Sequence, residues 1–317
     1  MRTSTSPTSS LFLPGPDRQT LMDKGIVQLD QWLIDVMRIG LLQYDFSDET
    51  LFEISSRMVD AKLGGVARRI RKLSSLERAD PNWVKQVLQI LGDLYLMVSA
   101  FKNRRQLTLT MQISLFSLAG FNAKKTDILT LNAIEDFWLV CGIEHDAEEN
   151  LKVRYTWLMG VKSKRTALLL DFAFGRSDFE FNYRFNQSYQ GSLIYYPGAF
   201  PLRAILQDSV PIKKISSFPG AFDSMAKFLD IYATAISRNP WIVNFPACLK
   251  NVSLTKAGDQ FLLRDQHDEL MTVNNENSAI WPLFSWIAVD QFTVFGIWNS
   301  ETITILSYEY RQFHYSL

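Results

Sequence analysis

Side chains that could act as nucleophiles or as acid–base groups are few in this sequence of 317 residues. The cysteines are Cys141 and Cys248, and the histidines are His145, His267 and His314. Two cysteines cannot make a disulfide framework or a zinc site built from several thiolates. Cys141 lies in an apolar stretch typical of a core strand, and Cys248 has no histidine close by. We therefore predict no catalytic, cofactor-binding or metal-binding residue.

Short patterns for covalent catalysis occur, but without the companions that such chemistry needs. Ser224 and Lys227 fit S-x-x-K, as do Ser253 and Lys256, whereas the motifs that accompany this pattern in known enzymes are missing. The sequence also lacks G-x-S-x-G, the phosphate-binding G-x-x-x-x-G-K-[ST], G-x-G-x-x-G and C-x-x-C. We expect Lys227 to lie on the polar face of a helix.

Two acidic segments could bind a hard cation or hold a pair of carboxylates. One is Glu144–Glu149, and the other contains Asp265, His267 and Glu269. Neither has the spacing of a calcium loop or of a zinc-binding helix. We predict that both are polar connections between strands.

The basic cluster Arg68, Arg69, Arg71 and Lys72 is the strongest electrostatic feature of the sequence. It could contact nucleic-acid phosphates or an acidic partner. It could also be the solvated face of a helix whose Ile70 and Leu73 point inward. The acidic second half of the chain and the lack of a recognisable nucleic-acid-binding fold favour this second interpretation.

A segment with four residues typical of protein interfaces follows a predicted strand. Tyr195, Tyr196, Phe200 and Arg203 surround a Pro-Gly turn, and tyrosine and arginine are frequent at the centres of interfaces. Exposed, these side chains would form a partner-contact surface; buried, the aromatic rings would be core. Both interpretations remain open.

The elements that carry these residues divide the chain in two. Residues 1–133 carry 17 basic and 13 acidic side chains and residues 134–317 carry 16 and 20, so the overall neutrality hides opposite charges. We predict a flexible leader over 1–22, a bundle of about six helices over 23–133, and a β-rich region over 134–317. The fold class is α+β, with a mostly antiparallel β region.

Periodicity supports this division. Apolar residues recur every three or four positions from Ile26 to Val36, with Met37 expected on the same face. Ser47 or Asp48 can cap a second helix whose apolar residues include Met58 and Val59, and a third runs from Val66 through Leu73. Asp80 precedes the next helix, which has a wide apolar face. The second half contains the apolar run 166–174 and one amphipathic helix near 220–238.

The sequence predicts a cytoplasmic protein with no membrane contact. The Ser/Thr-rich start has no apolar core of signal-peptide length. The two most apolar stretches are interrupted by Asp93 and Asp290, and neither reaches the roughly 18 uninterrupted apolar residues of a spanning helix.

A series of segments resembles a known family. They are QWLID (31–35), RMVDAK (57–62), GVARR (65–69), LQILGDLYL (88–96), DFWLV (136–140), RYTWL (154–158), RTALLLDFA (165–173) and YYPGA (195–199). In this order they resemble the long region that follows the zinc finger in bacterial SWIM zinc-finger family proteins. The resemblance extends from about residue 24 to the end and is weakest after residue 210.

The family's finger is a C-x-C…C-x-H motif that binds one zinc ion, and this sequence has no such motif. The resemblance therefore implies the post-finger region alone, without the family's zinc. It also implies work with MoxR-type AAA+ ATPases and von Willebrand-type A-domain proteins.

Three functions follow as hypotheses. The first is a non-catalytic interaction or adaptor protein. The second is nucleic-acid binding through the Arg68–Lys72 helix face. The third is an enzyme of unrecognised type that uses Asp171 or His145.

Overall fold

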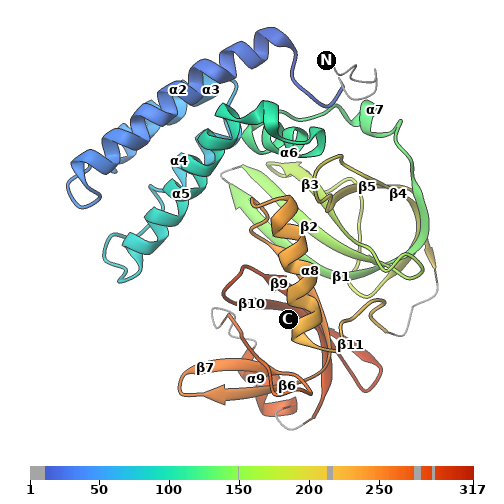
Figure 1. The fold of residues 1–317 in the computed structure, drawn as a ribbon. Helices are drawn as coiled ribbons and strands as arrows, with labels where there is room; N and C mark the ends of the chain where they lie inside the picture. Colours follow the sequence, from blue (N-terminus) through green and yellow to red (C-terminus); the bar gives the residue numbers. More distant parts are fainter. Residues whose placement is uncertain (1–10, 149, 213–216, 275–279, 288–289) are drawn as a thin grey trace. The chain divides into compact units, whose positions relative to one another are not determined.

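The computed structural model describes residues 11–148, 150–212, 217–274, 280–287 and 290–317. They form two compact units. The helical unit contains the described residues up to Thr130 together with Pro197–Ala199, and the β-rich unit contains Leu131–Tyr196 and Phe200–Leu317. The predicted fold class is confirmed, because helices in the first part are followed by a mainly antiparallel β-rich part (Figure 1).

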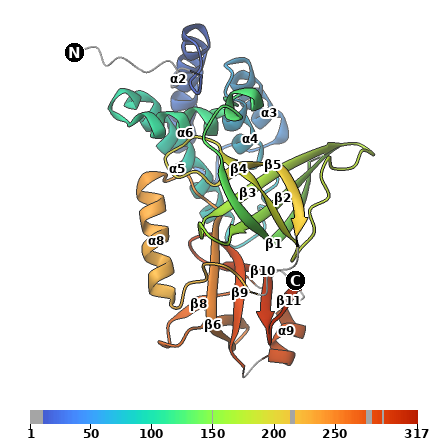
Figure 2. The same cartoon turned by 90° about the vertical axis from the view of Figure 1, so that its right-hand side faces the viewer.

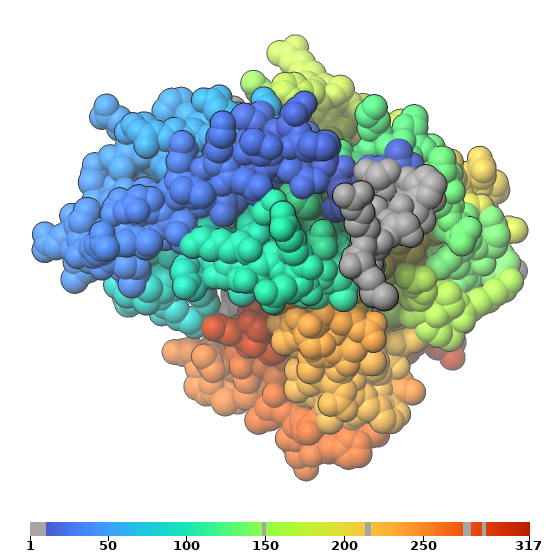
Figure 3. Space-filling model, turned by 45° about the horizontal axis from the view of Figure 1, so that its top comes forward, coloured from blue at the N-terminus to red at the C-terminus, as the bar shows by residue number. Residues whose placement is uncertain are grey.

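The helical unit is built from helices that follow one another with short connections. They are α2 (Pro16–Ile39), α3 (Asp48–Asp60), α4 (Gly64–Arg71), α5 (Trp83–Lys102), the short 3-10 helix η1 (Arg104–Gln106), α6 (Leu109–Ala119) and α7 (Lys125–Ile128). Helix α2 packs along α5, and Figure 3 shows α2 in blue across one face beside the teal residues. Helix α3 packs on α4, which also contacts α5 and α6.

Local signals explain where several helices begin. The Ser47 side chain accepts a hydrogen bond from the Thr50 N–H, and Thr108 starts α6 in the same way. Helix α2 starts earlier than predicted, at Pro16, so residues 16–22 are helical and do not belong to a flexible leader. Proline suits a first helical turn because its missing N–H would have no partner there. Residues 1–10 of that leader lie outside the described part.

The bundle core follows the predicted periodicity with two differences. The inner face of α2 buries residues from Met22 to Val36, as expected. Met37 and Val59 were expected on inner faces, but they are 59% and 46% exposed. Both lie near the end of a helix, at the margin of its buried face.

The β-rich unit contains a closed barrel and an open sheet (Figure 2). The barrel strands are β1 (Ile134–Glu148), β2 (Leu151–Gly160), β3 (Thr166–Phe174), β4 (Ser188–Tyr195) and β5 (Arg203–Ile212). They close in the order β1-β2-β3-β5-β4, and all pairs are antiparallel except β3 with β5. The barrel core includes Trp138, Leu158, Leu169 and Leu193.

The second sheet has six strands in the order β11-β10-β9-β6-β7-β8. Its elements are β6 (Phe245–Ala257), β7 (Gln260–Arg264), β8 (Leu270–Thr272), β9 (Phe292–Trp298), β10 (Ile303–Tyr310) and β11 (Phe313–Ser316), with helices α8 (Met225–Arg238) and α9 (Ile280–Ile287). Helix α8, the predicted amphipathic helix, buries Phe228 against this sheet. The acidic segment from Glu144 belongs mostly to β1, although a turn was predicted there.

An apolar layer joins the barrel to the second sheet. It contains Leu139 and Trp157 from the barrel and Phe295 and Ile297 from the sheet. Within this layer, the hydroxyl of Ser307 on β10 donates a hydrogen bond to the carbonyl oxygen of Cys141 on β1. The outer side of β1 near this residue is therefore covered.

Candidate functional site

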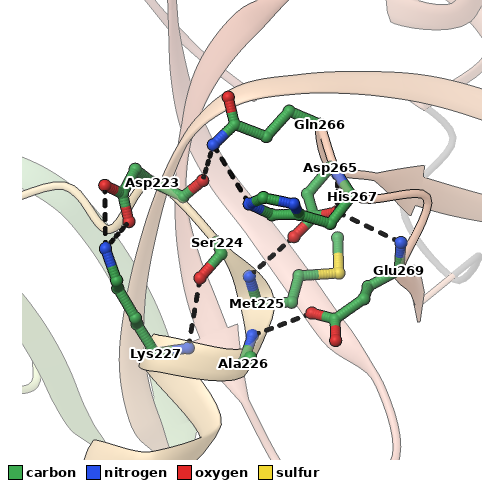
Figure 4. Close-up of polar contacts among 9 residues, drawn as sticks. All are labelled: Asp223, Ser224, Met225, Ala226, Lys227, Asp265, Gln266, His267 and Glu269. Carbon is green, nitrogen blue, oxygen red and sulfur yellow. Dashed lines mark hydrogen bonds and ion pairs between the residues drawn. The ribbon is translucent and has the colours of Figure 1, made fainter.

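Ser224 and Lys227, the first of the two S-x-x-K pairs, lie at the first turn of α8 (Figure 4). The Ser224 hydroxyl accepts a hydrogen bond from the Lys227 N–H at 3.3 Å, which is the geometry of an N-cap. The Lys227 ammonium pairs with Asp223 at 2.9 Å and is directed away from the Ser224 hydroxyl. The pattern therefore begins a helix, and its lysine lies on the polar face as predicted.

The acidic segment after β7 completes the same helix terminus. The Asp265 carboxylate is 5% exposed and accepts hydrogen bonds from the backbone N–H groups of Met225, His267 and Glu269, at 2.9, 2.8 and 3.1 Å. Glu269 accepts a further bond from the Ala226 N–H at 2.9 Å. Burial raises the pKa of Asp265, but the three N–H donors outweigh burial and hold that pKa below its ordinary value.

The hydrogen bonds of Asp265 and Glu269 show that the acidic segment after β7 caps a helix. A negative carboxylate at a helix N-terminus satisfies free N–H groups and interacts favourably with the helix dipole. Asp265 and Glu269 both accept hydrogen bonds from N–H groups in the first turn of α8, and the His267 side chain is exposed beside them. Among the described residues, no group of three or more His, Cys, Asp or Glu side chains could hold a metal ion.

A buried ion pair lies inside one end of the barrel. Arg154 on β2 and Asp171 on β3 are cross-strand partners, and their side chains are 5% and 17% exposed. The guanidinium donates to one Asp171 oxygen at 2.8 and 3.2 Å and to the Phe181 carbonyl oxygen. It also lies 4.4 Å from the centre of the Phe179 ring. Asp171 thus holds a buried cation in place, while His145 is exposed beside the same ring.

The two thiols are buried in the layer between barrel and sheet. Cys141 and Cys248 are 0% and 2% exposed, and neither forms a disulfide. Burial raises the pKa of both thiols well above the ordinary value. Because the thiolate is the reactive form, both are chemically quiet core residues in the folded state.

His314 lies in the same part of the β-rich unit, in surroundings that its position near the chain end did not suggest. Its side chain is 1% exposed and stacks on Phe218, with ring centres 4.8 Å apart. One ring nitrogen lies 3.4 Å from a Glu309 oxygen, and the other contacts the Asn186 amide oxygen.

The basic cluster divides into exposed and bound side chains. Arg68, Arg71 and Lys72 are exposed, whereas Arg69 is half-buried. Arg69 donates to the carbonyl oxygens of Gly65 and Leu118, at 3.1 and 3.3 Å, and so ties α4 to the end of α6. Burial lowers the pKa of Arg69.

The four predicted partner-contact residues are half-buried. The Arg165 guanidinium lies 4.0 Å from the centre of the Tyr195 ring, and the Arg203 guanidinium lies 4.3 Å from that of Tyr196. Burial raises the pKa of Tyr195 to about 12, although Arg165 opposes this rise. Phe200 packs against the core of the second sheet.

An exposed apolar stripe on α5 was not singled out from the sequence. Val84, Leu88 and Tyr95 are 41%, 44% and 60% exposed, and their spacing of four and seven residues places them on one side of the helix. By length and composition alone α5 could cross a membrane, and 33% of its most apolar window is buried in the bundle. The stripe lies next to the buried face of α5. In the sequence, the two together appear as one unusually wide apolar face, and this width was the feature that could have indicated the stripe.

Comparison with known families identifies the helical part. Residues 17–118 match the model of the SWIM-associated four-helix bundle domain. This confirms the resemblance over α2 to α6. Comparisons with curated proteins and with solved structures gave no significant match.

Proposed function

We propose that this chain, whose residues 17–118 form a SWIM-associated four-helix bundle domain, is a non-catalytic interaction protein of the cytoplasm. The observation that carries the proposal is the apolar stripe of Val84, Leu88 and Tyr95 on α5. Apolar side chains in a row are stabilised when a partner removes them from water, and tyrosine is frequent among the residues that dominate interface energies.

The partner we propose is a MoxR-type AAA+ ATPase or a von Willebrand-type A-domain protein, as the family resemblance implies. A non-catalytic role is supported by the structural interactions of the side chains that could otherwise react. Ser224, Asp265 and Glu269 cap α8, Asp171 binds Arg154, and the thiols are core residues.

The test is affinity capture from native lysate with the full chain as bait. We expect an ATPase or A-domain protein with the wild type, and its loss with the double variant Leu88→Ser, Tyr95→Ser. Leu96→Ser is the matched control, because Leu96 lies on the same helix, is 40% exposed and lies outside the stripe. Equal recovery with all three baits, or no such partner with a folded wild type, would contradict the proposal.

A second candidate function is nucleic-acid binding through α4. The exposed cations Arg68, Arg71 and Lys72 favour it, and Arg69 is excluded from it by its internal hydrogen bonds. Phosphate contacts make affinity fall steeply with salt. Binding that is unaffected by salt, or by the triple alanine variant of these residues, would rule this function out.

A further inference from the structure

The barrel has the connectivity of a fold that binds ligands on one known face. Its strand order β1-β2-β3-β5-β4, with β3 parallel to β5, is that of the OB-fold. Barrels of this fold bind extended ligands on the outer surface of their second and third strands. In this chain that surface belongs to β2 and β3. Where it carries Trp157 and Leu168 it packs against the second sheet, and the remaining part lies beside the second half of β1 (Figure 2).

Strand register determines which side chains lie on this surface. Leu158 and Leu169 belong to the barrel core, so the alternate positions on β2 and β3 point outward. Outward positions on β2 include Val153 and Tyr155, and those on β3 include Phe172 and Phe174.

Direct pairing extends the surface onto β1. Asp146 pairs with Val153, which in turn pairs with Phe172, so these three side chains form one row across the sheet. We call the surface formed by Asp146, Val153, Tyr155, Phe172 and Phe174 the outer barrel face.

The outer barrel face is partly uncovered. Phe172 and Phe174 are 53% and 71% exposed, and Asp146 is exposed as well. Val153, between them in the row, is 8% exposed. Two neighbouring phenylalanines left in water on a rigid sheet are typical of a contact surface.

Charge decides what the outer barrel face can bind. Asp146 carries a negative charge on the β1 side of this surface, and Glu144, two residues earlier, lies on the same side of the strand. Glu144 is half-buried and accepts a hydrogen bond from the Trp157 indole at 3.0 Å, whereas Asp146 is exposed and can meet a ligand. The β-rich unit as a whole has 20 acidic and 16 basic side chains. These charges repel phosphate and attract ammonium or guanidinium groups.

The spacing of the groups suits an extended chain. Neighbouring strands are about 4.8 Å apart, so a segment lying over β2 has β1 on one side and β3 on the other at that distance. Its alternate side chains then point to opposite sides, about 6.8 Å apart along each side. That repeat equals the spacing of Phe172 and Phe174 along β3, which are two residues apart.

We propose that the outer barrel face binds a positively charged peptide segment of a partner protein, in which basic residues alternate with apolar ones. The apolar side chains contact Phe172 and Phe174, and a basic side chain pairs with Asp146. Basic groups that reach β3 gain cation–π contact with the phenylalanine faces. This surface is separate from the α5 stripe and does not depend on it.

The test measures fluorescence anisotropy of a short labelled peptide of alternating lysine and valine with the full chain. A glutamate–valine peptide and a labelled oligo(dT) serve as alternative probes. We expect the lysine–valine peptide to bind and the other two probes not to bind, and we expect the affinity for this peptide to fall as the salt concentration is raised. Phe172→Ser and Asp146→Lys should each weaken it roughly tenfold or more.

Phe313→Ser is the matched control, because Phe313 is 62% exposed on β11 of the second sheet. Thermal melting establishes that each variant is folded; if Phe172→Ser is not, Phe174→Ser replaces it. Absence of peptide binding to the wild type, equal binding by all variants, or binding of oligo(dT) in place of the peptide would overturn the proposal.

Discussion

Replacing Asp265 by alanine tests the assignment of the acidic segment to helix capping. The change removes the acceptor of three backbone hydrogen bonds. The Met225 N–H is buried, so losing its partner costs about 2 kcal/mol, whereas the two loop N–H groups can reach water and cost about 0.5 kcal/mol each. We expect the free energy of unfolding to fall by about 3 kcal/mol, a large part of the roughly 5–15 kcal/mol typical of proteins.

The measurement is equilibrium unfolding in urea followed by circular dichroism. With a slope of about 2–3 kcal/mol per molar urea, the midpoint should fall by roughly 1 M. Hydrogen exchange at the first amides of α8 should accelerate, because that turn loses its cap. Asp268→Asn is the matched control, since this side chain is 85% exposed and lies 3.7 Å from Arg264, and asparagine tolerates the φ of 62° at this position.

The effect should depend on pH in one direction. The pKa of Asp265 is lower in the folded protein than the ordinary value of about 3.9, so ionised Asp265 stabilises the folded state above about pH 4. This contribution is lost as the pH falls through the lower folded-state value. The difference between wild type and Asp265→Ala should therefore be constant near neutrality and shrink in acid. An effect no larger than that of Asp268→Asn, or one that grows in acid, would refute the assignment.

Three further predictions concern the packing of both units. Asp171→Asn leaves the buried Arg154 charge without its counter-ion, so the free energy of unfolding should fall by about 3–5 kcal/mol in chemical denaturation. Cys141 and Cys248 should react with a thiol reagent only after denaturant is added, and rapid labelling of the native protein would contradict their burial. Gly65→Ala should lower the melting temperature of the helical unit, since a Cβ there would lie 2.0 Å from a backbone oxygen of α6; unchanged melting would contradict this close approach.

Local patterns in the sequence predicted the elements well. The strand at 166–174 has the predicted bounds, and Ser47 is the N-cap that its position suggested. The Gly258-Asp259 pair, a residue combination typical of hairpin turns, joins β6 to β7, and Gly258 has a φ of 59° that glycine adopts without strain. Each of these features depends on residues adjacent in the chain.

Long-range pairing was beyond such reasoning. The barrel closes through the pairing of Leu168 with Arg203, and no periodicity within either strand indicates which strand it will meet. The role of Asp265 depends on Met225, 40 positions earlier in the sequence. The width of the apolar face of α5 was visible, but which part its neighbours would leave exposed was not.

The segment Pro197–Ala199 bears on how the chain is made. These residues belong to the helical unit, where the Ala199 N–H donates to the Ser114 hydroxyl at 2.9 Å. During synthesis the helices leave the ribosome first. The segment Pro197–Ala199, which contacts them, follows only after strands β1 to β4 have been made. The helical unit is therefore completed only after most of the barrel exists. A gene fragment that stops at Thr130 would encode every helix from α2 to α7 and still lack this piece of the unit.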